Sequence, residues 1–211
     1  MKDLIKKLLR EGLLGEDAFT SSHLPENTGL FIEPNNSGAS LTLYNPKTRM
    51  AHATITFISH ITSGPYHYVS GVAAEKGFGP LIYELAFMYV DSINSKLMPS
   101  RDGDVREGAF NVWKKMYERN DIDKITLDVK DDNFRFDILT GEEEHTTEEE
   151  RIELFNDYDN DEQYNLLVFN TGYSKIPNDE YNKLIDNAKA YPEKIHILAH
   201  KKGDELWQSS Y

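Results

Sequence analysis

The fold is decided by the stretch Val72-Ala73-Ala74-Glu75-Lys76-Gly77-Phe78-Gly79-Pro80-Leu81-Ile82-Tyr83, which carries the chain from a strand-like run into a helix-like run. Gly77 and Gly79 mark the turn between the two runs, and Pro80 is a residue that helices accept in their first turn. The first N–H groups of a helix have no partner inside it, so such a turn presents donors to an anion. The stretch therefore predicts an α/β protein with a candidate phosphate site at Gly77, Phe78 and Gly79.

The segments around this turn predict a sheet with helices. Residues 39–44 and 51–58 have the composition of strands, and Asn45-Pro46-Lys47-Thr48 between them is typical of a turn, so they predict a hairpin. A third strand at 66–72 leads into the glycine turn, and a well-buried helix at 80–96 follows it. Further along, we expect a strand at 96–99, a helix at 105–118, a strand at 124–129, a short helix with a capping box at Thr147 and Glu150, a strand at 166–170, a helix at 179–191 and a strand at 194–199.

The first 38 residues precede this pattern. Apolar residues recur at helical spacing near the N-terminus, with basic residues on the other side: Leu4, Ile5, Leu8 and Leu9 against Lys6, Lys7 and Arg10. Such an amphipathic helix packs on its own domain, or it docks on a membrane surface or a protein partner, and the pattern leaves these alternatives open. Residues 15–38 are rich in Gly, Ser, Pro and Asn and predict an irregular connection.

Composition narrows the class of protein. A chain of 211 residues forms one domain of ordinary size, or one domain with an elaboration. The absence of cysteine excludes disulfides, thiolate metal sites and a cysteine nucleophile. No apolar run reaches the roughly 20 residues that span a bilayer, so we expect a cytoplasmic protein without a transmembrane segment. The net charge is −13, and residues 128–162 carry 15 acidic and 3 basic side chains. Duplex nucleic acid is therefore not an expected partner, and the main body is close to neutral.

Residues 39–129 resemble the acetyl-CoA-binding core of the GNAT acyltransferases. In that family a strand leads into Gln/Arg-x-x-Gly-x-Gly/Ala, and Ala74-Glu75-Lys76-Gly77-Phe78-Gly79 has this spacing. The stretch 74–121 is also similar to GNAT-like proteins of tailed bacteriophages, through Gly77-Phe78-Gly79-Pro80-Leu81-Ile82-Tyr83, Met98-Pro99-Ser100-Arg101-Asp102 and Val112-Trp113-Lys114-Lys115-Met116-Tyr117. The resemblance implies an α/β (α+β) fold with a mixed, mostly antiparallel sheet. It also implies an N-terminal extension at 1–38, a core at 39–129, an acidic insertion at 130–165 and a C-terminal completion of the same domain at 166–211.

The resemblance implies roles for individual residues. The coenzyme would be held by residues of the turn and of a later loop: Ala74, Lys76, Gly77, Phe78, Gly79 and Arg101. Glu75 is the candidate general base, with the histidines His52, His60 and His67 as alternatives that the spacing does not separate. Tyr117 is the candidate proton donor to the departing thiolate, because Trp113 stands where the family has its Tyr and an indole N–H is not an acid near neutral pH.

Two further departures from the family pattern concern the candidate phosphate site at Gly77–Gly79. Ala74 replaces the Gln/Arg, which removes a polar side chain, and Pro80 supplies no N–H.

Asp157-Tyr158-Asp159-Asn160-Asp161 begins like a calcium loop but is followed by Glu162 instead of Gly, so no metal is expected.

Two functions follow from the sequence. In the first, the protein is a GNAT-like acyltransferase that moves an acetyl group from acetyl-CoA to an amine by direct attack, and the acidic segment favours a cationic acceptor such as a polyamine or a lysine side chain. In the second, it is a non-catalytic GNAT-fold phage protein, either a virion component or a binder or inhibitor of a host protein. Its contact would then be the acidic segment or the N-terminal helix.

Overall fold

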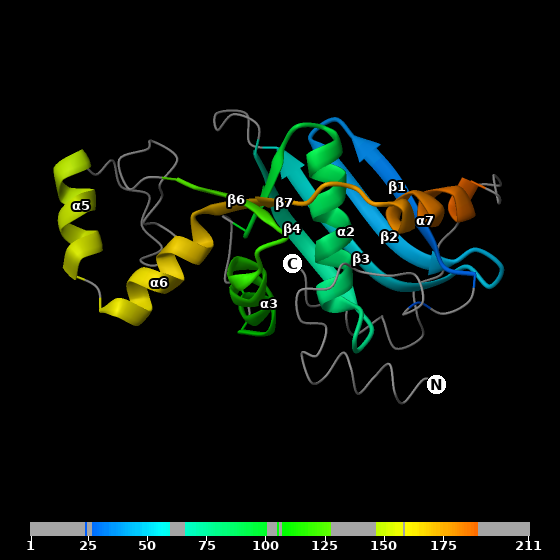
Figure 1. Cartoon of the computed structure of the whole chain (residues 1–211), viewed down its shortest axis with the longest axis horizontal. Helices are drawn as coiled ribbons and strands as arrows, with labels where there is room; N and C mark the ends of the chain where they lie inside the picture. Colours follow the sequence, from blue (N-terminus) through cyan, green and yellow to red (C-terminus); the bar gives the residue numbers. More distant parts are fainter. Residues whose placement is uncertain are drawn as a thin grey trace.

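The computed structural model describes residues 24, 27–59, 66–100, 105, 107–127, 147–157 and 159–189. Its strands form one sheet in the order β1-β2-β3-β4-β5-β7-β6 (Figure 1). The elements are β1 (Gly29–Asn35), β2 (Gly38–Asn45), β3 (Met50–Ser59), β4 (Tyr66–Ala74), α2 (Gly79–Ser92), β5 (Lys96–Met98), α3 (Glu107–Glu118), β6 (Asp123–Thr126), α5 (Glu148–Asp157), α6 (Asn160–Phe169), β7 (Thr171–Ser174) and α7 (Asp179–Lys189). The predicted N-terminal helix, the strand at 194–199, His60 and Arg101 lie outside the described residues.

The sheet is mixed and mostly antiparallel, as expected. Strands β1 to β4 follow one another as antiparallel neighbours, and β7 pairs antiparallel with both β5 and β6. The exception is the parallel pair of β4 and β5, which are joined by α2. The predicted hairpin of β2 and β3 is confirmed, and so is the helix at 179–191, which forms α7.

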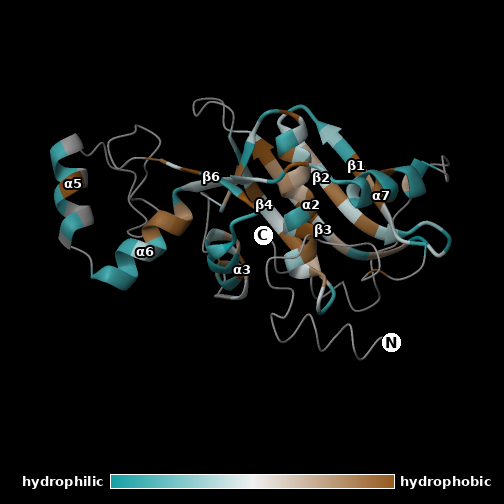
Figure 2. Ribbon diagram, viewed as in Figure 1, coloured by the Kyte–Doolittle hydropathy of each residue, from teal (hydrophilic) through white to brown (hydrophobic). Residues whose placement is uncertain are grey.

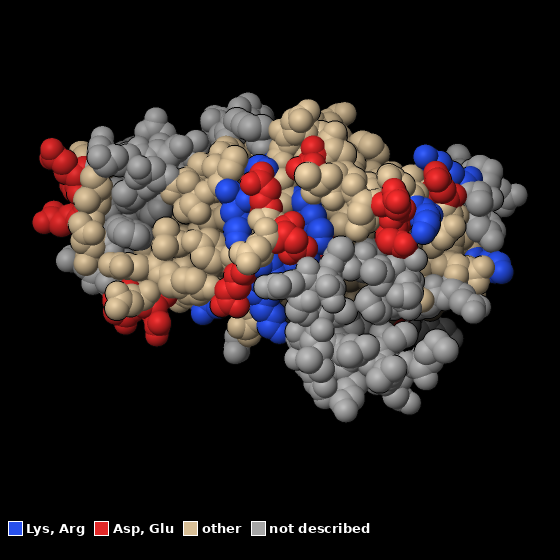
Figure 3. Space-filling view, viewed as in Figure 1, with Lys and Arg blue, Asp and Glu red and all other residues tan. Residues whose placement is uncertain are grey.

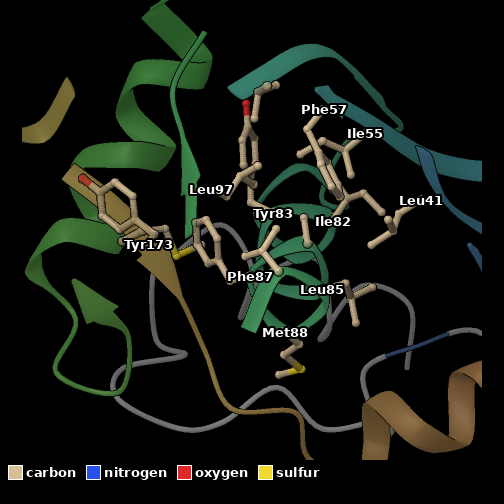
Figure 4. Close-up of a cluster of buried hydrophobic side chains, with 14 of the residues drawn as sticks. Leu41, Ile55, Phe57, Ile82, Tyr83, Leu85, Phe87, Met88, Leu97 and Tyr173 are labelled. Atoms are coloured by element: carbon tan, nitrogen blue, oxygen red, sulfur yellow. The ribbon is translucent and has the colours of Figure 1, made fainter. Parts of the chain in front are cut away.

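Alternation along the strands sorts side chains onto two faces of the sheet. Leu41 and Ile55 face each other across β2 and β3 and are fully buried, and Figure 4 shows them directed toward α2. Between them in sequence, the hydroxyls of Thr42 and Thr54 meet at 3.1 Å on the opposite face. The apolar colouring of the central strands and of α2 in Figure 2 marks the layer where the core lies.

Helix α2 is the centre of that core. Its residues from Ile82 to Met88 are all buried, and it contacts β2, β3, β4, β5 and β7. A helix that is apolar almost all round is a core helix, as the sequence predicted. Trp113 of α3 packs edge-on against Tyr83 at 5.0 Å and lies 5.0 Å from Tyr173 of β7, so one aromatic cluster joins α2, α3 and β7.

Two boundaries differ from the prediction. The helix expected to reach residue 96 ends at Ser92, because Asn94 has a positive φ of 54° and the Ser95 N–H returns to the Val90 carbonyl at 2.8 Å. The strand expected at 166–170 is wrong, since these residues end α6 and β7 begins at Thr171. Asp159 begins α6 by accepting the Glu162 N–H, and a short apolar run cannot be assigned to strand or helix by its pattern alone.

β1 is a third difference, because residues 29–35 were expected to be irregular. The strand pairs along its full length with β2, and Leu30 is buried in the core. The strand was not predicted because its alternating apolar run is short and is flanked by Gly29, Pro34 and Asn35, which are typical of turns. The capping box is confirmed: the Thr147 N–H donates to Glu150 Oε2 at 2.7 Å, and the Glu150 N–H donates to Thr147 Oγ1.

A closed ring of four charged side chains ties distant segments to α2. Glu84 of α2 binds Arg119 at 2.8 Å and also Lys175, and Asp121 binds the same two cations at 2.6 and 2.7 Å. We call these four residues the charged ring. Glu84 and Lys175 are almost fully buried. Figure 3 shows acidic and basic side chains interleaved across this part of the surface, over α2, β6 and β7.

The ring changes the acidity of its carboxyl groups. Burial by itself would raise the pKa of Glu84, but hydrogen bonds and charges from Arg119 and Lys175 outweigh it, and the pKa lies below its ordinary value. The pKa of Asp121 is held well below its usual range by the same two cations, again against the effect of burial. Both carboxylates are therefore ionised in the folded protein at neutral pH.

We expect Glu84→Gln to lower the free energy of unfolding by about 3–5 kcal/mol, because it leaves two buried cations with one carboxylate between them. The measurement is urea unfolding followed by circular dichroism. Asp186→Asn is the matched control, since Asp186 and Lys189 form an exposed pair at 3.5 Å, and we expect a change of less than about 0.5 kcal/mol. Equal effects of the two substitutions would contradict a stabilising role for the ring.

The ring also predicts how stability depends on pH. Glu84 and Asp121 have lower pKa values folded than unfolded, so the unfolded chain binds more protons and stability falls as the pH falls. We expect full stability above about pH 5 and a progressive loss below it, as the pH approaches the folded values. Unfolding midpoints measured from pH 7 to pH 3 test this, and Glu84→Gln should show a shallower loss than the wild type.

Candidate functional site

The glycine turn directly follows β4, at the end of the part of the strand that extends beyond its pairing with β5. β4 and β5 pair only where residues Tyr66 to Tyr68 face Lys96 to Met98, and β4 then continues to Ala74 without β5 beside it in the described structure. Helix α2 begins directly after the turn that follows β4. In open sheets with parallel strands, ligands bind outside the carboxyl ends of the strands where neighbouring connections diverge. The turn lies outside the carboxyl end of one such strand, β4.

The backbone of the turn is arranged around Gly77, which has a φ of 98°. Only glycine adopts this region readily, since a Cβ would clash with the backbone. The Phe78 N–H donates to the Glu75 carbonyl at 3.0 Å, and the Ile82 N–H donates to the Phe78 carbonyl at 3.0 Å as the first bond of α2. The first of these bonds closes the turn. It also means that the Phe78 N–H, one of the predicted anion donors, is already bonded within the protein.

Three backbone donors remain at the start of α2. The N–H groups of Gly77, Gly79 and Leu81 have no acceptor within the described residues. The sequence predicted Gly77, Phe78 and Gly79 as the donors and did not predict Leu81. Because the Phe78 N–H is bonded to Glu75, the donors that remain are Gly77, Gly79 and Leu81. The first turn of α2 contains no acidic residue, and no side chain among the described residues caps it. Lys76 is exposed beside it.

His52 fastens the turn to β3 by three contacts. Its carbonyl accepts the Glu75 N–H at 2.8 Å, its Nδ1 lies 2.9 Å from Glu75 Oε2, and its ring stacks on Phe78 at 5.0 Å with an interplanar angle of 14°. His52 is the extra residue of a β-bulge, because Leu43 pairs with Ala53 and Tyr44 pairs with Ala51. Bulges re-aim side chains and are frequent beside active sites.

The pair of His52 and Glu75 shows which ring nitrogen of His52 carries the proton. An ionised carboxylate only accepts hydrogen bonds, so Nδ1 of His52 is the donor to Glu75 and Nε2 carries the lone pair when the ring is neutral. Nε2 is buried and has no hydrogen-bond partner among the described residues, although the side chain as a whole is 17% exposed. The sequence offered His52 as one of three histidines. The structure brings it to Glu75, which is 23 positions away in the sequence, and to the turn.

The other predicted residues lie in different places. Ala74 ends β4, and Arg101 is outside the described residues. Tyr117 is half-buried on the last turn of α3, with its ring edge-on to Tyr164 at 5.6 Å and Lys124 Nζ 5.6 Å from its centre. Trp113 is 1% exposed in the aromatic cluster of the core. The described contacts of Tyr117 and Trp113 thus involve α2, α6, β6 and β7 and not the turn.

Comparison of the chain with protein-family models, with curated proteins and with solved structures finds no match. Within the described part of the chain, no helix is long and apolar enough to cross a membrane. The same residues contain no group of three or more His, Asp or Glu side chains placed to hold a metal ion.

We expect Gly77→Ala to lower the free energy of unfolding by about 1–2 kcal/mol, because alanine is strained at a φ of 98°. Gly79→Ala is the matched control: a Cβ there meets no atom within 4 Å, and alanine favours the helix by up to about 1 kcal/mol. Chemical denaturation of both variants measures the difference. A Gly77→Ala protein as stable as Gly79→Ala would refute the strained turn.

Proposed function

We propose that this protein binds acetyl-CoA at the turn Glu75–Gly79 and moves its acetyl group to an amine, as a GNAT-like acyltransferase. The observation that carries the proposal is the start of α2 beyond the carboxyl end of β4, where three N–H groups have no acceptor among the described residues. A pyrophosphate is the part of coenzyme A that such a helix start would bind. The exposed side chain of Lys76 would add a positive charge.

The arrangement of the fold supports the same proposal. A hairpin, a third strand, the glycine turn, a core helix, a strand, a second helix and a further strand follow one another, in the order that the resemblance to GNAT acyltransferases implies. The strand that enters the turn and the strand that follows the helix are parallel neighbours. The turn is therefore both the sequence motif and the link between β4 and the core helix α2.

The transfer itself requires two proton movements. The amine nitrogen of the acceptor attacks the thioester carbonyl, the carbon–sulfur bond breaks, the amine loses a proton and the thiolate gains one. Glu75 is an acid–base group within the turn, and its Oε2 lies 2.9 Å from Nδ1 of His52. Tyr117 stays the predicted proton donor. The acceptor would be cationic, because the exposed side chains of α5 and α6 are largely acidic: Glu149, Glu150, Glu153, Asp159, Asp161 and Glu162.

One observation favours a second candidate, a non-catalytic protein on the same fold. Trp113 occupies the position at which the resemblance implies a Tyr, and it is buried among Tyr83, Phe87 and Tyr173. It is a core residue that has no proton to give at neutral pH. A phage protein that binds a host protein or belongs to the virion would keep the fold and use another surface. The acidic helix α5, far from the sheet in Figure 1, would be that surface.

We expect acetyl-CoA at 100 times its dissociation constant to stabilise the protein by about 2.7 kcal/mol, measured as a thermal shift. Gly79→Glu should fold normally, because its side chain enters open space and a carboxylate is favourable at a helix N-terminus, but it should lose the shift by repelling the pyrophosphate. Gly79→Gln is the matched control for size without charge and should retain most of the shift.

Transfer is measured as release of the coenzyme A thiol in the presence of a polyamine. The chain contains no cysteine, so a thiol reagent reports only the product. No thermal shift with millimolar acetyl-CoA would overturn coenzyme binding. A shift that Gly79→Glu abolishes, without thiol release on any amine tested, would support a binding protein over an enzyme.

A further inference from the structure

The outer edge of β1 carries backbone groups that no described residue binds. β1 is an end strand of the sheet and pairs only with β2 among the described strands. Pro34 has no N–H, so its pair with Ala39 is a non-hydrogen-bonded pair, and the alternation of an antiparallel ladder gives Ile32 and Leu30 the same geometry. The N–H and C=O groups of Ile32 and Leu30 therefore point away from β2, and they have no partner within the described residues.

The two halves of this edge are protected to different degrees. At the far end Glu33, Pro34 and Asn35 are exposed, and a charge and a proline are features by which native sheets block pairing with another chain. Leu30 and Ile32 form the near half and have neither feature. Leu30 is buried in the core, and Ile32 is partly buried against it. Because an open apolar edge is an aggregation site, this near half requires a cover.

Helix α7 brings the chain to the near half of the edge. It packs along β1, as Figure 1 shows, and its buried side chains belong to the same core as Leu30. Asn187 Nδ2 donates to the Thr28 carbonyl at 2.9 Å, and a Cβ on Gly29 would lie 3.0 Å from the nitrogen of Ala188. The end of α7 therefore lies beside the start of β1, with residues 190–211 still to follow.

The segment that follows has the pattern and the spacing to fit there. Residues 194–199, which lie outside the described residues, read Lys-Ile-His-Ile-Leu-Ala, and the sequence predicts them to be a strand. In a strand, Ile195 and Ile197 share one face and His196 lies on the other. Residues 190–193 include Pro192, which cannot continue a helix, and their number is usual for a helix-to-strand connection. Such a connection spans up to about 16 Å, which exceeds the roughly 10 Å between packed layers.

We propose that the near half of the β1 edge is the docking surface for residues 194–199 of the same chain, which extend the sheet by one strand parallel to β1. A strand that starts beside Gly29 and follows β1 runs in the same direction as β1. Its backbone binds the outward N–H and C=O groups of Leu30 and Ile32, and Ile195 and Ile197 extend the core beside them. The inference concerns the edge of the sheet and does not rest on the proposed coenzyme site.

Pairs of introduced cysteines test this proposal, since the chain has none of its own. Glu33→Cys is exposed on the face opposite the core, and pairing that starts at residue 194 beside Gly29 puts residue 198 next to it. We expect Glu33→Cys with Leu198→Cys to form a disulfide within one chain on mild oxidation, because neighbouring strands bring Cα atoms into bonding range. Pairs with His196→Cys and His200→Cys allow for a shift of register by two. Glu33→Cys with Ile197→Cys is the matched control and should stay reduced, because residue 197 would face the core.

The state of the thiols is measured by mass spectrometry after blocking, and by gel electrophoresis without reductant. An internal disulfide in one of the three pairs and none in the control supports the proposal. No disulfide in any pair, or equal formation in the control, would overturn it. A disulfide that joins two chains would assign the edge to a second copy and would also overturn it.

Hydrogen exchange on the unmodified full chain is the second measurement, and it needs no substitution. The Glu33 N–H points toward β2 and is protected in either case, whereas the Ile32 N–H is protected only when the edge is covered. We expect both amides to exchange slowly. Fast exchange of the Ile32 amide beside a protected Glu33 amide would show an open edge and contradict the proposal.

Discussion

The charged ring of Glu84, Arg119, Asp121 and Lys175 is the constraint on which the rest of the structure depends. Helix α2 is buried on nearly all sides, yet it carries the carboxylate of Glu84 into the core. The two cations that neutralise Glu84 come from the turn before β6 and from the segment after β7. That segment is fixed a second time, because the Lys175 N–H donates to the Phe87 carbonyl of α2 at 3.2 Å. The chain therefore crosses α2 at one defined place, and α7 then reaches the edge of β1.

The charged ring contributes more to the positions of the segments around α2 than to the net free energy of unfolding. Removing four charges from water costs much of what their mutual attraction returns, so an apolar replacement of the whole ring would be close to neutral. A partial ring is a different matter, since it leaves a buried charge without its partner. We infer that the ring fixes the approach of two segments to α2 and so fixes the helix itself. Because the turn at Gly77 is the start of that helix, its position follows from contacts far from it.

The sequence predicts the elements that depend on local patterns. The hairpin of β2 and β3, the turn at Gly77, the core helix and the capping box at Thr147 follow from neighbouring residues, and the structure contains them. The end of α6 was missed because its apolar run suits a strand as well as a helix. The charged ring and the pair of His52 with Glu75 join residues that only the sheet register brings together. No spacing in the chain encodes them, and a bulge decides where His52 lies.

Several features that violate local rules lie at the turn, and they are the reason to regard it as a candidate site. Gly77 has a positive φ, the uncapped helix start leaves N–H groups without acceptors among the described residues, and the ring of His52, which stacks on Phe78, has a buried Nε2 without a partner among them. Other such features lie elsewhere, namely the positive φ values of Asn27, Arg49 and Asn94 and the buried Oδ1 of Asn165. Each feature alone has a structural explanation. Together those at the turn destabilise the same few residues, while the core and the charged ring satisfy their own polar groups almost completely. An anion at the start of α2 would satisfy the N–H groups that have no acceptor among the described residues, and this is the physical reason to test the turn before any other segment.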